Sequence, residues 1–235
     1  MCHGPPTPLE RGCARSRRQQ RARRLRRLPK RCAPPGVAPL WKGTHLVGRV
    51  RPARHAGSVD VFLEALGRAE PGDVLVVDNA GRLDEACVGD LVALEVRHAA
   101  LSGIVIWGLH RDSSELRSIR LPVFSLGAYP AGPQRLDEQG ADALDSARVG
   151  EHVTTPDDFV LGDDDGVVFL PLDRAAEIAH LAQTIRDTER GQAERMNLGT
   201  SLRSQTRFDE YLAARDADGT TFRQHLRSTG GAIEE

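Results

Sequence analysis

Three polar residues are spaced so that the start of a helix and the end of a strand could bring them to one small ligand. Asp90 follows Gly89, and twenty residues separate it from the adjacent pair Arg111 and Asp112. Asp90 opens a segment with helical spacing, and the pair comes just after the apolar run 103–107. The start of a helix attracts anions, and α/β sheets bind ligands just past the ends of their strands. We therefore predict that these residues meet at one site.

The residue types at this site suit a keto acid and a metal ion. The planar fork of Arg111 can hold a carboxylate through two parallel hydrogen bonds. Asp112 offers a hard oxygen to Mg²⁺ or Mn²⁺, and Mg²⁺ keeps several waters and needs only one or two protein carboxylates. Asp90 could hold one of those waters or move a proton. A ligand could approach the helix start closely because of its glycine, along the backbone of Gly89, Asp90, Leu91 and Val92.

A plainer interpretation stays open. Asp90 and Arg111 could form an ordinary ion pair, and Asp112 could cap the helix that follows, because this spacing alone is a weak motif. The lysines narrow the chemistry further, since the chain has only Lys30 and Lys42, both before the motif. A Schiff-base aldolase needs a lysine in its site, so carbon–carbon chemistry here would use a metal-stabilised enolate.

The elements that must position these residues follow from apolar runs and spacing. Continuous apolar runs predict strands that are covered on both faces, and weaker patterns predict further strands. We expect strands at 45–53, 74–77, 103–107 and 122–126. Helical spacing predicts helices over 59–69, 91–101 and 113–119, with a loop over 79–88. Strands that alternate with helices predict an α/β domain of βαβ units.

Two details of these helices are also predicted. Ser58 is expected to cap the first helix. In the helix over 91–101, the residues expected to face the core are Leu91, Ala93, Leu94 and Leu101.

The rest of the chain is less regular. Residues 158–170 predict a hairpin that turns at Asp163–Gly166, rather than a calcium loop. A long helix is expected over 172–195, and the last residues are polar and weakly periodic. We therefore expect a basic tail over 1–33, a catalytic domain over 34–200 and a polar extension over 201–235.

Charge is distributed unevenly along the chain. Residues 1–33 hold eleven basic residues and one acid, and the rest holds 21 basic and 32 acidic residues, a net charge of −11. Such a tail could bind nucleic acid, act as a targeting peptide, or have no selected role.

Three of the four cysteines lie in this tail, and only Cys87 lies in the body. With no apolar run long enough to span a membrane and no disulfide framework, we expect a cytoplasmic protein.

Several segments together resemble the RraA-like family. They are Gly72–Asp78, Gly89–Val92, Gly103–Trp107 with Arg111 and Asp112, Leu121–Phe124, and Gly162–Val168 with Pro171, in family order. The family includes the regulator of ribonuclease activity A and divalent-metal 4-hydroxy-4-methyl-2-oxoglutarate aldolases. The resemblance covers about residues 36–200 and implies a β/β/α swivelling-domain fold with a C-terminal helix.

The resemblance also implies an activity and an assembly. An aldolase of this family cleaves a 4-hydroxy-2-oxo acid to pyruvate and can decarboxylate oxaloacetate, with Arg111 and the amides of Gly89–Val92 on the pyruvyl group and Asp112 on the metal. It implies a homotrimer or hexamer in which a neighbouring C-terminal helix supplies an acid, for which Glu194 is the candidate. The alternative is a protein without enzyme activity that regulates ribonuclease E.

Departures from the family pattern lie close to the site. Trp107 stands where the family usually has Asp, and its ring could narrow the substrate pocket. His110 replaces a small apolar residue, and we interpret it as a packed or exposed histidine rather than a base. Arg120 replaces a common glycine. Cys87 is expected to be a small buried thiol.

Overall fold

The computed structural model describes residues 31–229, which fall into two compact units that divide after Ala175. The first unit holds every strand of the described chain, and the second holds most of the long helix α5 (Ala175–Asn197) together with the helices that follow it. The expected boundary near residue 200 therefore differs from this division, because α5 groups with the C-terminal residues.

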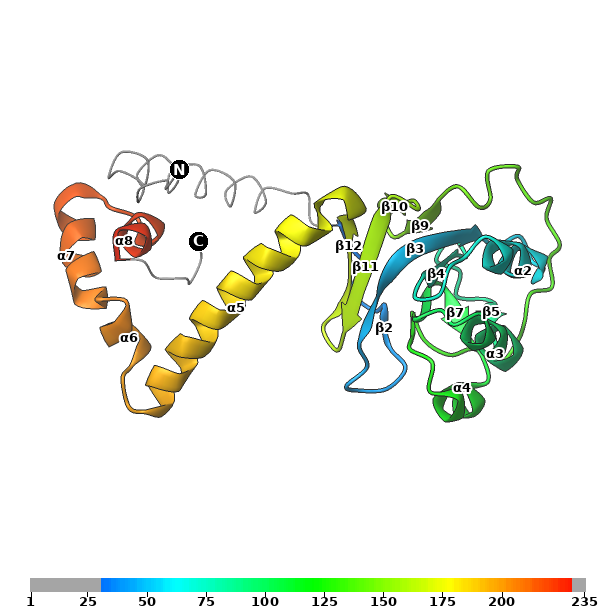
Figure 1. The fold of residues 1–235 in the computed structure, drawn as a ribbon, viewed down its shortest axis with the longest axis horizontal. Coiled ribbons are helices and arrows are strands. Elements are labelled where there is room, and N and C mark those ends of the chain that lie inside the picture. Colours follow the sequence, from blue (N-terminus) through cyan, green and yellow to red (C-terminus); the bar gives the residue numbers. More distant parts are fainter. Residues whose placement is uncertain (1–30, 230–235) are drawn as a thin grey trace, which may run out of the picture. The chain divides into compact units, whose positions relative to one another are not determined.

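An eight-stranded mixed sheet forms the first unit (Figure 1). Its strands, in spatial order, are β1 (Arg31–Cys32), β12 (Gly166–Pro171), β11 (Asp158–Asp163), β3 (Leu46–Arg54), β4 (Val74–Asp78), β6 (Gly103–Trp107), β8 (Val123–Ser125) and β2 (Ala38–Pro39). β3, β4, β6 and β8 are parallel to one another, and the remaining pairs are antiparallel. The four predicted parallel strands and the hairpin of β11 and β12 are confirmed.

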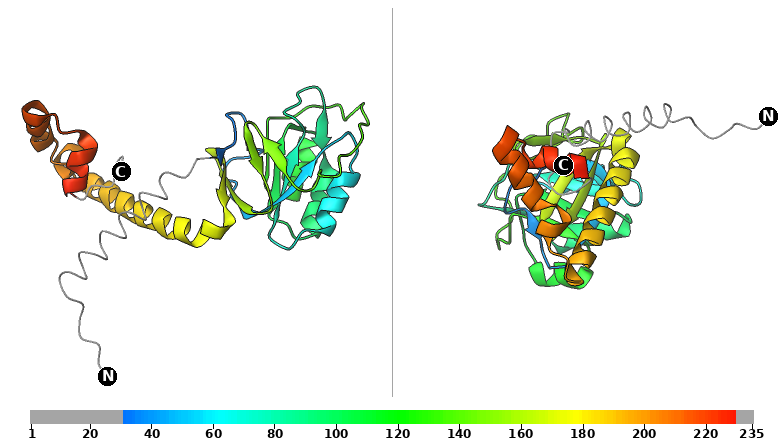
Figure 2. Two further views of the ribbon diagram at one scale, coloured as in Figure 1. Left: turned by 90° about the horizontal axis from the view of Figure 1, so that it is seen from above. Right: turned by 90° about the vertical axis from the view of Figure 1, so that its left-hand side faces the viewer.

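Helices cover one face of the parallel strands (Figures 1 and 2). They are α2 (Asp60–Gly67), α3 (Asp90–His98) and α4 (Ser113–Ile119). Beneath them, Phe62, Ala93 and Leu116 are buried with Leu75 and Ile104 of the sheet. The cap predicted for α2 is wrong, because its N-cap residue is Val59 and no side chain caps it.

A second apolar core lies on the opposite face of the sheet. Val74 and Val76 of β4 point into it, together with Phe124 and Phe169, and Ala147 comes from the hairpin of β9 (Ala147–Val149) and β10 (His152–Thr154). The alternate residues of β4 are buried beneath the helices. A strand with a core on each face needs apolar residues at every position, which explains the continuous run 74–77.

Two predictions near the site are wrong. Residues 86–88 form β5 (Ala86–Val88), which pairs in parallel with β7 (Leu109–His110), although 79–88 was expected to be a loop. On α3, Leu91 is 75% exposed and Leu94 38% exposed. These two leucines were wrongly expected to face the core. Ala93 and Leu101 are buried as predicted, and Val96 is buried in addition.

The N-terminal boundary lies slightly earlier than Pro34. Arg31 and Cys32 form β1, which pairs with β12. The Arg31 guanidinium contacts the buried carboxylate of Asp158 at 3.0 and 2.5 Å. Because Arg31 is basic, composition alone assigned it to the tail, although its strand pairs with β12 in the sheet. Residues 1–30, which hold the rest of the predicted tail, lie outside the described residues.

The C-terminal unit is helical, although only a polar extension was expected. After α5, which follows a short 3₁₀ turn at Leu172–Arg174, come α6 (Leu202–Gln205), α7 (Phe208–Asp218) and α8 (Phe222–Thr229). Aromatic rings join α7 and α8, with Phe222 4.9 Å from Tyr211 and 5.6 Å from Phe208 between ring centroids. No helix between residues 31 and 229 has the length and apolar character needed to cross a bilayer.

Candidate active site

The N-terminus of α3 forms one side of the predicted site. Gly89 is the N-cap residue and Asp90 is the first helical residue, with no side chain capping from the N-cap position. The carboxylate of Asp90 accepts a hydrogen bond from the N–H of Leu91 at 2.7 Å. The N–H of Leu91 thus already donates to a carboxylate oxygen of the chain, which is the kind of partner that a helix start favours.

The Arg111–Asp112 pair forms the other side. β7 leads into it, and the Arg111 N–H donates to the carbonyl of Val88 at 2.9 Å. Asp112 has a left-handed backbone, with φ of 59°. This conformation is uncommon outside glycine, although aspartate tolerates it better than most residues, and it often marks a functional site.

The direction of the Asp112 side chain decides between the two interpretations of the motif. Asp112 occupies the N-cap position of α4, but its side chain does not cap that helix. Its Oδ2 instead accepts the Asp90 N–H at 3.3 Å and lies 3.4 Å from the Arg111 Nε. In the described chain no ion pair joins Asp90 to Arg111. The ion pair and the side-chain cap of the plainer interpretation are therefore absent from the described residues. The Asp112 carboxylate lies between the Asp90 N–H and the Arg111 Nε, while the Asp90 carboxylate bonds to the N–H of Leu91.

Two glycines leave just enough space for this pair. A Cβ at Gly89 would overlap the Asp112 Oδ2 and stand 3.0 Å from the Arg111 Nε. A Cβ at Gly132 would overlap the Arg111 Nη1. Neither glycine has a positive φ, so each is required for space rather than for backbone freedom. The sequence motif included Gly89 and missed Gly132.

Backbone hydrogen bonds hold Gly132 in place. The N–H of Tyr129 donates to the His110 carbonyl at 2.8 Å, and the N–H of Ala86 donates to the Ala131 carbonyl at 2.8 Å. The segment before Gly132 is thereby tied to both β5 and β7, the two strands that flank the site. Because these bonds join residues far apart in the sequence, no local pattern could have indicated them.

The residues present fit a hydrated divalent cation. No group of three or more His, Cys, Asp or Glu side chains that could hold a metal occurs in residues 31–229, which disfavours a cation bound mainly by protein ligands. The Asp112 side chain is 36% exposed, so water can reach its carboxylate. One carboxylate with water in the remaining positions is a normal environment for Mg²⁺.

Two neighbours of the site are inert, as predicted. His110 is buried, with Nδ1 2.7 Å from the Ser125 hydroxyl and Nε2 2.9 Å from the Ser113 hydroxyl. Burial lowers the pKa of His110, and the charge of Arg117 lowers it further. Burial raises the pKa of the Cys87 thiol to about 12, so this cysteine is not a nucleophile.

The structure also describes two other residues that were singled out from the sequence, Trp107 and Glu194. The Trp107 ring packs on the turn after β4, where a Cβ at Gly81 would stand 2.7 Å from it. The Trp107 carbonyl also accepts the N–H groups of Asn79 and Gly81, both at 3.1 Å. Glu194 is an exposed residue of α5, in the C-terminal unit. Its role toward a neighbouring subunit stays a prediction.

Comparison with known proteins points to one family. A model of the RraA-like family, described as Aldolase/RraA, matches residues 23–169. The match begins inside the basic segment, earlier than the expected start near residue 36. It includes every predicted site residue except Glu194.

Relatives and solved structures add detail. A putative 4-hydroxy-4-methyl-2-oxoglutarate aldolase of Aromatoleum aromaticum is 39% identical over 98 residues, 41% of this chain and 60% of that protein. One of Halalkalibacterium halodurans is 29% identical over 136 residues, 57% of this chain and 64% of that protein. The crystal structure of Streptomyces coelicolor RraAS2, described as an unusual member of the RNase ES inhibitor RraA protein family, is 27% identical with a TM-score of 0.59, covering 71% of this chain and 85% of that chain. The chain thus spans less than two thirds of the length of either aldolase relative.

Proposed function

The chain belongs to the RraA-like family, and on that premise we propose that it is a divalent-metal-dependent pyruvate aldolase. Its substrate would be 4-hydroxy-4-methyl-2-oxoglutarate or a similar 4-hydroxy-2-oxo acid. The names of two relatives support this substrate class. The observation that carries the proposal is the Asp112 side chain, which turns away from its own helix toward the N-terminus of α3.

Arg111 and the start of α3 would bind the carboxylate of the substrate. The guanidinium is 42% exposed and its only ion-pair partner in the described chain is the adjacent Asp112. Exposed pairs of this kind contribute little stability, so a substrate carboxylate can replace Asp112 as the partner of the guanidinium with little loss of stability. The positive end of the α3 dipole would add to this attraction.

Asp112, with Asp90 through water, would hold Mg²⁺ or Mn²⁺ beside the keto oxygen. A cation bound there would supply Lewis-acid stabilisation of the negative charge that builds on that oxygen. Asp90 would accept, through water, the proton of the distal hydroxyl as the carbon–carbon bond breaks. Oxaloacetate presents the same carboxylate and keto oxygen, so we propose a decarboxylase side activity.

We also propose that the site is completed in a homotrimer or hexamer. The site residues are partly exposed in the single chain, and Leu91 beside them is 75% exposed. A single exposed leucine is ordinary on a protein surface, so the support for this assembly is the membership of the chain in the family. Glu194 of a neighbouring copy is the candidate for an additional acid.

The second candidate is a regulator of ribonuclease activity that has no enzyme activity of its own. The similarity to RraAS2 supports it. The complete set of Asp90, Arg111 and Asp112 favours the enzyme, because a regulator would not need an arginine and two carboxylates around a helix start. A ribonuclease E inhibition assay on purified protein would distinguish the two.

Pyruvate release tests the enzyme proposal. The purified protein is assayed with a panel of 4-hydroxy-2-oxo acids and oxaloacetate, with Mg²⁺ or with excess chelator. We expect metal-dependent turnover that falls at least about 100-fold in Asp112→Asn, since a positioned electrostatic group contributes about 3–4 kcal/mol. Asparagine tolerates the left-handed backbone, so the variant should fold.

Glu95→Gln is the matched control. Glu95 is an exposed acid on α3 outside the site, and its removal should leave turnover within about twofold. Full turnover in chelator, or unchanged turnover in Asp112→Asn, would rule out the metal mechanism.

A further inference from the structure

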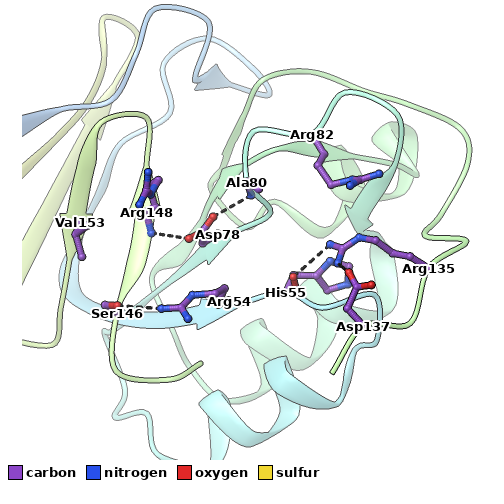
Figure 3. Close-up of a pocket in the computed structure, with 10 residues that line it drawn as sticks. All are labelled: Arg54, His55, Asp78, Ala80, Arg82, Arg135, Asp137, Ser146, Arg148 and Val153. Carbon is purple, nitrogen blue, oxygen red and sulfur yellow. Dashed lines mark hydrogen bonds and ion pairs between the residues drawn. The ribbon is translucent and has the colours of Figure 1, made fainter. Parts of the chain in front are cut away.

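A cavity of about 710 Å³ lies at the carboxyl ends of β3 and β4. Four arginines line it, namely Arg54, Arg82, Arg135 and Arg148 (Figure 3). None of the residues that line it belongs to the candidate active site. Its volume falls in the range of small-molecule sites, and α/β sheets bind ligands at this edge.

Two of the four arginines are occupied by structural contacts. Arg135 contacts both oxygens of the buried Glu85 at 3.0 to 3.2 Å and also pairs with Asp137. Arg82 pairs with Asp84 at 2.5 Å and lies 3.6 Å from Glu85. Because these two guanidiniums already bind carboxylates in the wall of the cavity, we assign them no role in binding a ligand.

The other two arginines are available. Arg148 is exposed, and in residues 31–229 its side chain has no hydrogen bond or ion pair. Arg54 pairs at 3.0 Å with Asp142, whose side chain is 63% exposed, and lies 3.3 Å from the Ser146 hydroxyl. An exposed pair of this kind is worth little, so a ligand could replace it.

The acids that line the cavity are already paired. Asp78 is buried, and its carboxylate accepts the N–H groups of Ala80 and Arg148, both at 2.9 Å. Asp137 pairs with Arg135. These carboxylates therefore have hydrogen-bond partners other than the Arg148 guanidinium, which has no ion-pair partner in residues 31–229 and is free to bind an anionic oxygen.

We propose that this cavity is a second anion-binding site, separate from the aldolase site. Two guanidinium forks from β3 and β9, with the Ser146 hydroxyl beside Arg54, suit a small ligand that carries at least two anionic oxygens. Phosphate esters and di- or tricarboxylates share this chemistry. The proposal does not depend on the aldolase activity.

Calorimetric titration of the full chain at low ionic strength tests this site, with inorganic phosphate in one arm and citrate in the other. We expect saturable binding of at least one anion that weakens at least about tenfold in Arg148→Gln and in Arg54→Gln, since each removes a charge-assisted contact. Arg148→Gln keeps the backbone hydrogen bond to Asp78, so the fold should be retained. Stronger binding of phosphate would indicate a phosphate ester, and stronger binding of citrate a polycarboxylate.

Two control variants make the test specific. Arg68→Gln removes an exposed arginine of α2 that does not line the cavity, and binding should change less than twofold. Arg111→Gln removes the guanidinium of the aldolase site, and binding at the cavity should persist. The proposal is overturned if neither anion binds, if Arg68→Gln weakens binding as much as Arg148→Gln, or if only Arg111→Gln abolishes binding.

Discussion

Two glycines set the position of the Arg111 guanidinium and the Asp112 carboxylate. Gly89 was evident from the sequence because it adjoins the helix start. Gly132 was not, because its neighbour in space is 21 residues away and its position depends on the segment that follows β8. The sequence could therefore indicate that the Arg111–Asp112 pair and the start of α3 come together, but not that Gly132 leaves room for the guanidinium.

Gly132→Ala is predicted to impair the site without unfolding the chain. Its φ is not positive, so alanine should be tolerated by the backbone, but its Cβ would displace the Arg111 guanidinium. We expect kcat/KM for pyruvate release to fall about tenfold to 100-fold, as expected when a positioned clamp is displaced. Gly67→Ala, where a Cβ meets nothing within 4 Å, should have native kinetics. Equal kcat/KM values for the two variants would show that Arg111 is not the clamp.

Two buried histidines should make stability depend on pH. Burial lowers the pKa of His55, although a hydrogen bond to Asn79 opposes this shift, and burial also lowers the pKa of His110. Each therefore takes up a proton at lower pH in the folded chain than in the unfolded chain, where it titrates near its ordinary pKa of about 6.5. The unfolded state therefore binds more protons at mildly acidic pH, and stability should fall as pH drops below about 6.5.

The double variant His55→Gln, His110→Gln tests this dependence. Its unfolding midpoint in urea should change less between pH 7.5 and 5.5 than that of the native chain. His98→Gln, at an exposed position on α3, should keep the native dependence. A double variant with an unchanged slope would mean that other groups cause it.

At the scale of elements, strands were easier to predict than helix faces. Residues 74–77 and 104–106 are buried on both faces of the sheet, so every residue in these two runs is apolar. α3 is different, since its two large leucines are exposed while smaller residues face the sheet. Spacing identifies an apolar stripe, but it does not distinguish the chain's own core from a surface that another copy could cover.

The short C-terminal helices were missed for a related reason. They are short, and α6 has only four residues, so the apolar spacing of each spans a single turn or little more, as with Phe222, His225 and Leu226 of α8. One local pattern could have revealed α8. The Thr221 hydroxyl and the Gln224 side chain bond across its first turn, with the Thr221 N–H donating to Gln224 Oε1 at 2.8 Å. This is a capping box.

Arg120→Gly should stabilise the first unit. Arg120 ends α4 in a left-handed conformation with φ of 62°, which explains why the family usually has glycine there. Its side chain is exposed, so little packing is lost. We expect the free energy of unfolding to rise by about 0.5–1 kcal/mol, measured by urea denaturation. Arg97→Gly, inside α3, should lower it by about 1 kcal/mol. Destabilisation by Arg120→Gly would mean that the arginine side chain contributes more than its strain costs.

At the scale of the whole molecule, the basic segment and the folded body meet at β1. Most of the segment is basic and poor in large apolar residues. Arg31 differs, because it pairs with an Asp158 side chain that is 6% exposed. The family match from residue 23 also argues that the boundary lies before Pro34.

Two truncations separate these contributions. Removal of residues 1–30 is expected to leave the unfolding midpoint unchanged and to abolish any salt-sensitive binding to RNA, because ten of the eleven basic residues are lost. Removal of residues 1–33 also takes away β1 and leaves the buried Asp158 without its guanidinium. That truncation should lower the free energy of unfolding by about 1–3 kcal/mol.

Arg31→Gln in the full chain should reproduce most of the loss in the free energy of unfolding, since it removes the charge and keeps the strand. If both truncations are equally stable, β1 contributes nothing to the sheet, and if both are destabilised equally, the contribution comes from residues before Arg31.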